Sequence, residues 1–483
     1  MFSFALTLDP KARTPMYEQL YRALAEAIRG GELRSGEKLP SKRALCALLG
    51  VSRATVETAY ELLRAEGYVE ARARSGFYVV QYQLLPAAEA RDLQEAVPSV
   101  SPRPELPAAA EKPPQWDLDL STSAVDVSLF PYASWAKLYK EVVYNSPELL
   151  QRGDPRGEQS LREALARLLS EYRGVRCRPE QLVVGSGLET LLGQLITLFG
   201  PEAVYAMEDP GYPAVERILL ARGRAVRCVP MDSAGMEAEA LEASGATAAY
   251  LTPSHQFPLG ITMPASRRSR LLHWAASGER WIIEDDYDSE FRWGGRPISS
   301  MQGMDRHGRV IYTGTFSRSL APAIRLAYMV LPPTLLERWQ DLYGRQQPTV
   351  SRYEQTVMAR FLDEGFYSRY LRRVGKLYGD RRKALLAALS QIQELEVSGA
   401  EGGIHCLLRL PRLSEAELLN RAAAAGLGLR GLSAYCRQAA PPPSTLVLGY
   451  GGLPTERIRE LAERLRSAWA PTTDSCVLTS LFL

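Results

Sequence analysis

The feature that most constrains the fold of this chain is a regular alternation of apolar, strand-like runs with helical periods beyond Trp116. Alternation of this kind predicts a parallel β-sheet that helices cover on both faces. A largely helical stretch follows at 335–395, and apolar runs at 404–410 and 446–450 indicate strands of a second, smaller subdomain. The strands expected in the main sheet are 203–207, 225–231, 248–252, 281–283, 310–312 and 326–331.

The first eighty residues follow a different pattern, in which helices precede a hairpin. Apolar spacing predicts helices at 17–28 and 53–66, with a short helix between them that Ser41 caps and Gly50 ends. Ser52 is the expected N-cap of the later helix. Two helices joined by a tight glycine turn form a helix-turn-helix, whose second helix enters the major groove of DNA.

Basic side chains are concentrated in this N-terminal segment. Residues 1–80 hold twelve Lys and Arg against nine Asp and Glu, which accounts for the whole formal net charge of +3. Two alternating runs between 67 and 80 predict a hairpin with a basic tip, which is a wing beside the groove-facing helix. Glu57 would be repelled by phosphate, so it either accepts a hydrogen bond from a cytosine amino group or faces away. The residues expected to contact DNA are Lys42, Arg43, Ser52, Arg53, Thr55, Arg72, Arg74 and Gly76.

Three motifs of this segment resemble those of the GntR family of winged-helix transcription regulators. They are Leu39-Pro-Ser-Lys-Arg, Val51-Ser-Arg-Ala-Thr, and Glu66-Gly-Tyr-Val followed by Ser75-Gly-Phe-Tyr-Val. The resemblance implies that residues 1–80 bind a double-stranded operator. The alternative is a three-helix packing module whose arginines are only solvated.

A proline-rich segment separates this module from the rest of the chain. Residues 81–116 hold seven prolines among alanines and glutamates, without a helical or strand period. Such a composition predicts a semi-flexible linker. The remaining residues, 117–483, then form the α/β domain, with a large subdomain at about 150–345 and a small subdomain made from the rest.

Several motifs of the α/β segment place functional groups at the ends of predicted strands. Val183-Val-Gly-Ser-Gly leads into a helix near Leu188, where free backbone amides form an anion site, although a plain strand-to-helix turn would have the same sequence. Tyr212 lies at a loop tip, where its ring could stack on a planar heterocycle, although surface tyrosines after Pro-Gly are common. The strand that begins at Trp281 ends in an acidic cluster, where one carboxylate could pair with a pyridine nitrogen, although a solvated strand end would have the same sequence.

A loop between two apolar strands, residues 310–330, carries hydroxyl groups and arginines. Small hydroxyl and glycine residues extend from Thr313 to Ser319, and Arg325 follows before the second strand begins. Hydroxyl and guanidinium groups that converge on one loop suit a bound anion such as phosphate.

Together with Thr252-Pro-Ser-His-Gln-Phe-Pro-Leu-Gly260, these motifs resemble the MocR-type regulators. In that group a GntR winged helix is fused to a fold-type-I, pyridoxal-phosphate aminotransferase-like domain. The resemblance implies an α/β domain with a small C-terminal subdomain, a homodimer and pyridoxal 5'-phosphate as cofactor. His255 could be read as a general base, but a histidine in a proline-flanked loop is more often structural. The cofactor-binding positions that the resemblance implies are Ser186, Gly187, Leu188, Tyr212, Asp285, Tyr287, Thr315, Ser317, Arg318 and Arg325.

One position departs from the family pattern. The lysine that forms the cofactor's Schiff base in relatives corresponds to Arg318, whose guanidinium stays protonated and is a poor nucleophile. No lysine occurs between Glu141 and Gly375, so no catalytic residue is expected in the large subdomain. Three interpretations remain open. In the first, the domain binds the cofactor non-covalently or senses a small amine or amino acid. In the second, it has lost the cofactor and serves as a scaffold. In the third, it is an active aminotransferase, which Arg318 opposes.

Composition adds limits on location and metal content. Six cysteines are scattered without a Cys-x-x-Cys motif, which predicts reduced thiols and neither a disulfide framework nor a zinc site. The N-terminal residues lack the pattern of a signal peptide, and no apolar run approaches the roughly 20 residues of a membrane span. We therefore expect a cytoplasmic protein without a membrane partner.

Overall fold

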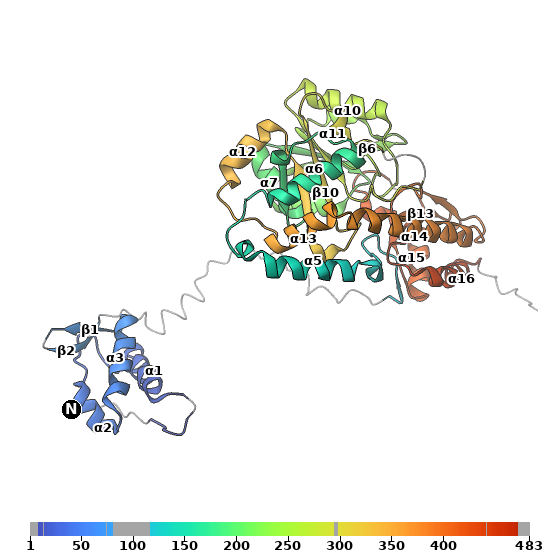
Figure 1. Cartoon of the computed structure of the whole chain (residues 1–483). Helices are drawn as coiled ribbons and strands as arrows, with labels where there is room; N and C mark the ends of the chain where they lie inside the picture. Colours follow the sequence, from blue (N-terminus) through green and yellow to red (C-terminus); the bar gives the residue numbers. More distant parts are fainter. Residues whose placement is uncertain are drawn as a thin grey trace, which may run out of the picture. The chain divides into compact units, whose positions relative to one another are not determined.

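The computed structural model describes residues 8–12, 14–73, 75–80, 116–293, 298–440 and 442–471. The chain divides into two compact units, Met1–Pro113 and Pro114–Leu483, each with its own core (Figure 1). Arg74 and all but one residue of the predicted linker lie outside the described residues. None of the helices in the described part of the chain is long and apolar enough to cross a membrane.

The N-terminal unit is a three-helix module with a two-stranded hairpin. Serine side chains cap two of its helices, since Ser41 accepts a hydrogen bond from the Ala44 amide and Ser52 accepts one from the Thr55 amide. Gly50 ends the middle helix with φ 66°, a backbone region that L-residues with side chains rarely adopt. The elements are α1 (Met16–Arg29), α2 (Lys42–Leu49), α3 (Arg53–Ala65), β1 (Val69–Arg72) and β2 (Gly76–Val79).

The core of this unit forms where the apolar faces of the three helices meet the hairpin. Spacing of three and four residues places these side chains on one face of each helix, so the opposite faces remain in solvent. The fully buried members include Leu20, Leu24, Leu45, Val56, Tyr60 and Leu63.

The second unit is built on an eight-stranded sheet with helices on both faces (Figure 1). Side chains alternate between the two faces, so that Tyr205 and Met207 join one cluster and Ala206 joins the other. The strands, in spatial order, are β4 (Leu182–Gly185), β11 (Ala327–Val330), β10 (Val310–Thr315), β9 (Trp281–Asp286), β8 (Ala248–Leu251), β5 (Val204–Asp209), β6 (Ala225–Asp232) and β7 (Gly235–Met236).

The helices of this unit fall into groups according to the layer that they cover. One face of the sheet packs on α7 (Leu188–Phe199), α8 (Pro213–Ala221) and α12 (Pro333–Tyr343), and the other packs on α9 (Ala238–Ala243), α10 (Ala265–Ser277) and α11 (Met301–Met304). The third and largest cluster contains buried residues of α5 (Tyr132–Asn145), α6 (Gln159–Arg173), α13 (Arg352–Asp363) and α14 (Phe366–Leu389).

The sheet differs from the fully parallel arrangement that the sequence predicted. β11 runs antiparallel to both of its neighbours, β10 and β4, and β7 runs antiparallel to β6. The connection from β10 to β11 covers only residues 316–326, and its one regular element in the described chain is a single 3₁₀ turn at Pro322–Ile324. A parallel crossover needs a dozen or more residues, usually with a helix, so the chain returns antiparallel.

A smaller sheet forms the core of the C-terminal subdomain. Alternation along β13 directs His405 and Leu407 away from the main cluster that contains Cys406 and Leu408. Leu407 instead joins a small cluster that contains Phe257, from the loop that follows β8. The small sheet therefore packs against a loop at the carboxyl ends of the parallel strands in the large sheet. Its strands, in spatial order, are β12 (Glu396–Ser398), β13 (His405–Arg409), β16 (Thr445–Gly449) and β15 (Arg430–Gly431), and α15 (Glu415–Ala424) and α16 (Ile458–Ala468) pack beside them.

Candidate functional site

The first turn of α3 presents the side chains that the sequence assigned to the DNA groove. The Ser52 hydroxyl lies 2.8 Å from the Thr55 hydroxyl and accepts a hydrogen bond from its amide, so both residues are fixed at the helix start. The Arg53 side chain is 80% exposed, and Arg43 is exposed on α2. This end of the helix is therefore accessible to a large partner.

Glu57 lies between two of the predicted DNA contacts. Its Oε1 accepts hydrogen bonds from Arg53 Nε at 3.1 Å and from Lys42 Nζ at 3.3 Å. These bonds, the one from Arg53 first, lower the pKa of Glu57. In this structure the carboxylate is thus paired with two cations of its own module.

The hairpin forms a wing whose basic residues rest on an aromatic ring. Arg72 pairs with Gly76 across the hairpin end, and its guanidinium lies 4.3 Å from the centre of the Tyr78 ring. Lys38 reaches the same ring, because a β-bridge joins it to Tyr78. Lys38 was not among the residues expected to contact DNA, since only the tertiary fold brings it to the wing.

In the second unit, the carboxyl ends of β8, β9 and β10 bring polar groups together around Asp285. Asp285 accepts a hydrogen bond from the Thr313 hydroxyl at 3.2 Å and another from the Tyr250 hydroxyl. Burial raises the pKa of Asp285 to about 6. The predicted alternative of a solvated strand end is therefore wrong, because only 7% of the residue is exposed.

Tyr287 lies two residues beyond Asp285, with its hydroxyl 3.1 Å from His255 Nδ1. The same nitrogen lies 2.9 and 3.1 Å from the two carboxylate oxygens of Asp288. Burial raises the pKa of Tyr287, Asp288 adds to that effect, and the charge of Arg318 opposes it. Arg318 therefore lies within electrostatic reach of this group.

Aromatic rings line the space beside these polar groups. Phe257 meets Tyr212 edge to face, with ring centres 5.5 Å apart, and it meets Tyr287 in the same way at 6.0 Å. Tyr212, at the start of α8, is 38% exposed, so the residue is partly open to solvent. Phe257 was not expected in the site, because its packing partners come from segments far apart in the chain, among them Tyr212, Tyr287 and Leu407.

Arg325 and Gly187 come together because β4 and β11 are neighbouring strands, paired at Gly185 and Ala327. A Cβ added to Gly187 would lie 2.5 Å from Arg325 Nη2, so the guanidinium rests directly on the glycine. Arg325 itself has φ 51°, an unusual backbone conformation for a residue with a side chain. Gly187 is the N-cap of α7, where backbone amides and the helix dipole favour an anion.

Hydroxyl groups lie on the same two loops. Ser186 contacts Thr190 through their side-chain oxygens at 2.9 Å, and its amide donates to the Thr349 hydroxyl at 3.1 Å. Thr315 and Ser317 likewise lie 2.9 Å apart through their side-chain oxygens. Leu188 is the first residue of α7, as the sequence predicted. The phosphate-binding positions implied by the resemblance thus occupy the ends of three strands that are adjacent in the sheet.

Arg318 lies in the loop between β10 and β11. Its Nη1 is buried and has no hydrogen-bond partner within the described residues. Five other buried side-chain polar atoms lack a partner among the described residues, and two of them lie near the carboxyl ends of the strands: Glu208 Oε1, at the end of β5, and His255 Nε2, in the loop after β8. Burial raises the pKa of Glu208 to about 7. Buried polar atoms are nearly always paired, so a group of unpaired ones at one sheet edge indicates a place for a ligand.

The winged helix-turn-helix and the fold-type-I sheet occur together in known proteins. The family model for bacterial regulatory proteins of the gntR family matches residues 16–79, and the model for aminotransferase class I and II matches residues 117–465. The chain is 35% identical, over 97–98% of both sequences, to the probable rhizopine catabolism regulatory protein MocR of Rhizobium meliloti. This chain belongs to the MocR-type subgroup of the GntR family.

Other comparisons agree with this assignment. An uncharacterized HTH-type transcriptional regulator of Bacillus subtilis, YhdI, is 38% identical over 97% of this chain and 98% of its own length. The crystal structure of LysN, the α-aminoadipate aminotransferase of Thermus thermophilus, in complex with N-(5'-phosphopyridoxyl)-L-leucine, superposes with a TM-score of 0.64. The two sequences are 26% identical, and the match covers 73% of this chain and 91% of the enzyme chain.

The MocR-type assignment gives the two units their general roles. The protein is a transcription regulator with a GntR DNA-binding domain and an aminotransferase-like domain. In the aminotransferase-like domain, the residues expected to hold a cofactor lie along one sheet edge, at the carboxyl ends of the parallel strands. Ligands in open α/β sheets bind at that edge.

Proposed function

We propose that this MocR-type regulator binds operator DNA through residues 1–80 and senses a small ligand through residues 117–483, with 81–116 as the linker. The aminotransferase-like domain forms a homodimer and holds pyridoxal 5'-phosphate, or a small amine or amino-acid effector, without a covalent bond. Arg318 occupies the position of the Schiff-base lysine. The protein is therefore a sensor that uses the aminotransferase fold and does not turn over a substrate.

The observation that carries this proposal is the unpaired Nη1 of Arg318. This buried guanidinium nitrogen has no hydrogen-bond acceptor in the described chain. A buried donor without an acceptor destabilises the fold by roughly 1–3 kcal/mol, and by more when it is charged, unless a ligand accepts its hydrogen bond. A carboxylate or phosphate oxygen is the usual partner of a guanidinium. We infer that Arg318 replaces covalent attachment with a charged hydrogen bond to an anionic group of the ligand.

The side chains present fit the cofactor. Arg325 and the amides at Gly187 would bind its phosphate, helped by the hydroxyls of Ser186, Thr315 and Ser317. That phosphate site would admit the anion closely because residue 187 lacks a side chain.

The ring of the cofactor would be held by a separate group of residues. Asp285 would pair with its pyridine nitrogen, Tyr287 would approach its 3-oxygen, and Tyr212 would cover its face. When bound, the cofactor supplies an electron-accepting ring. A chain without lysine between Glu141 and Gly375 cannot fix it there as an imine.

Two alternatives predict different outcomes in one experiment. Purified full-length protein is dialysed against pyridoxal 5'-phosphate, and bound cofactor is measured before and after treatment with borohydride. Reversible binding without a pyridoxylated peptide is the expected result. Stoichiometric pyridoxylation of one lysine of the aminotransferase-like domain, such as Lys376 or Lys383, would support an active aminotransferase and refute our proposal, whereas no binding at all would support a regulator that keeps the fold only as a scaffold.

A further inference from the structure

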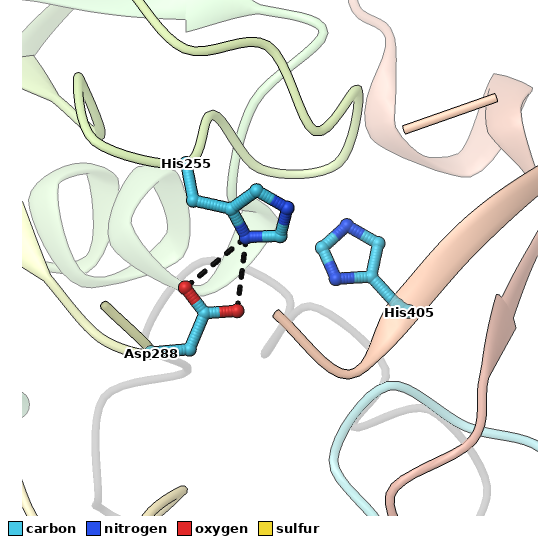
Figure 2. Close-up of side chains that lie close together, drawn as sticks. All are labelled: His255, Asp288 and His405. Atoms are coloured by element: carbon cyan, nitrogen blue, oxygen red, sulfur yellow. Dashed lines mark hydrogen bonds and ion pairs between the residues drawn. The ribbon is translucent and has the colours of Figure 1, made fainter. Parts of the chain in front are cut away.

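Three buried side chains with metal-binding chemistry meet where the small sheet contacts the large one. His255 comes from the loop after β8, Asp288 from the loop after β9, and His405 from β13 of the small sheet (Figure 2). One possible ligand atom from each of the three lies within 4.8 Å of the others. This group does not include the phosphate-site residue Arg325, but it adjoins the ring site of the proposed function, since the Tyr287 hydroxyl lies 3.1 Å from His255 Nδ1.

The hydrogen bonds of His255 leave one ring nitrogen available. A carboxylate can only accept a hydrogen bond, so the contacts with Asp288 at 2.9 and 3.1 Å place the ring hydrogen on Nδ1. In the neutral imidazole, Nε2 then keeps its lone pair. That nitrogen is buried without a partner among the described residues, and the whole residue is only 6% exposed. Figure 2 shows the edge of the His255 ring that carries this nitrogen facing the ring of His405.

His405 is held in the same way from the other side. Its Nε2 lies 3.1 Å from the Pro258 carbonyl oxygen, which can only accept, so Nε2 carries the hydrogen and Nδ1 keeps a lone pair. Burial lowers the pKa of His405 to about 3, and the nearby His255 acts in the same direction. The ring is therefore neutral near neutral pH. The centres of the two imidazoles are 4.9 Å apart, with an angle of 51° between their planes.

We propose that His255 Nε2 and His405 Nδ1 bind a divalent transition-metal ion, with Asp288 as the carboxylate that orients His255. Histidine ligands in metal sites almost always donate their other ring hydrogen to a carboxylate or a backbone carbonyl, and both histidines here do so. Paired imidazoles favour Zn²⁺, Ni²⁺ or Cu²⁺ over Mg²⁺ or Ca²⁺, which prefer oxygen ligands.

Two protein nitrogens leave other positions of the ion open. The charge of Arg318 is near enough to contribute to the lowered pKa of His405, so it opposes positive charge here and favours an anionic ligand at the open positions of the ion. The acidic side chain of Asp288 balances part of the charge of the ion. Because His405 belongs to the small sheet and His255 to the large subdomain, a bound ion would join the two parts of the aminotransferase-like domain.

The histidine content of the chain allows a clean test. Only four histidines are present, and the other two, His273 and His307, are exposed. Untagged full-length protein is stripped with EDTA and titrated calorimetrically with ZnCl₂, on a background that carries His273→Gln and His307→Gln. One Zn²⁺ per chain is the expected result on this background. His255→Gln or His405→Gln should then weaken binding at least about tenfold, and Asp288→Asn should weaken it about 10- to 100-fold.

A second measurement on the protein with all four histidines guards against variants that fail to fold. Cu²⁺ is added at less than one equivalent, and the electron paramagnetic resonance spectrum is examined for coupling to imidazole nitrogens. Coupling to two nitrogens supports the proposal. Loss of binding in the His273/His307 double variant would show only adventitious surface ions, and binding that survives both His255→Gln and His405→Gln would equally overturn the site.

Discussion

The guanidinium of Arg325 lies directly on Gly187, where a Cβ would stand 2.5 Å from its Nη2. The contact joins the loop after β4 to the loop before β11, two segments about 140 residues apart in the chain. It also leaves the amides at the start of α7 unshielded beside a positive charge. An anion placed there would contact both these amides and the guanidinium of Arg325.

Gly187→Ala should therefore weaken ligand binding as well as stability. The added methyl group would displace Arg325, so we expect the affinity for pyridoxal 5'-phosphate to fall at least about tenfold, by analogy with the loss of one charge-assisted contact. Binding is measured by equilibrium dialysis. Because residue 187 also has φ 118°, some loss of stability of roughly 1–2 kcal/mol is expected.

Gly200→Ala is the matched control for that change. Gly200 has a comparably strained φ of 85°, but a Cβ there would meet nothing within 4 Å. The control should lose a similar amount of stability and keep its affinity for the cofactor. Equal losses of affinity in both variants would mean that strain alone, and not displacement of Arg325, accounts for the effect.

Arg318→Lys should restore a primary amine at the position where relatives carry one. If Arg318 occupies the lysine position, the variant should gain a visible absorbance band with pyridoxal 5'-phosphate, and borohydride treatment should yield a pyridoxylated peptide that contains the introduced lysine. Arg318→Met, which has no charge and no amine, should gain neither. Reversible binding by Arg318→Lys without any covalent product would show that residue 318 does not reach the aldehyde carbon.

The sequence predicted the local elements well, because short-range signals determine them. The Ser41 and Ser52 caps, the Gly50 turn and the strand that begins at Trp281 lie where the sequence placed them, within a few residues at the boundaries. Caps, glycine turns and apolar runs act over a few residues, so they can be recognised without the rest of the chain. The direction of β11 was wrong because it depends on the length of a connection and not on the strand itself.

The site was less predictable where it depends on contacts between distant segments. Nothing around His405 in the sequence indicates that its ring lies 4.9 Å from that of His255, since β13 and the loop after β8 meet only through packing of the two subdomains. Lys38 joins the wing for a similar reason. The roles of Ser186, Thr315 and Arg325 as phosphate ligands remain predictions, although the structure places them on neighbouring loops.

Asp285→Asn should change how stability depends on pH. Burial raises the pKa of Asp285 to about 6, above the roughly 3.9 of an unfolded aspartate, so the folded state binds this proton more tightly. The stability that this group contributes is complete below about pH 4 and is lost as the pH rises through about 6, amounting to roughly 2–3 kcal/mol. Asparagine cannot ionise, so the stability of the variant, measured by thermal unfolding, should not fall by this amount as the pH rises through 6.

Asp117→Asn provides a control of opposite sign. Hydrogen bonds from Arg457, and then from Arg464, lower the pKa of Asp117. Its contribution is present above about pH 4 and lost in more acidic solution, so asparagine should destabilise the protein only at the higher pH values. If Asp285→Asn showed the same direction of change as Asp117→Asn, the carboxyl of Asp285 would be ionised without cost in the folded protein.

Glu57→Gln should strengthen binding to operator DNA. Glu57 accepts hydrogen bonds from Lys42 and Arg53, and removing its charge frees both for phosphate. We expect affinity for a duplex containing the adjacent promoter to rise several-fold. The slope of log affinity against log salt concentration should also become steeper by about one unit, which corresponds to one more released counterion. Arg53→Ala should weaken binding and make that dependence shallower by a similar amount. Fluorescence anisotropy over a range of salt concentrations measures both.

Arg64→Ala tests whether these effects belong to the start of α3. Arg64 lies in the last turn of the same helix and pairs with Glu61 at 2.6 Å, so its removal should leave affinity and salt dependence nearly unchanged.

The sequence of the duplex provides a further distinction. If Glu57→Gln weakens binding, and the loss disappears when one G·C pair is replaced, Glu57 reads a cytosine amino group and its pairing with Lys42 and Arg53 belongs only to the free protein.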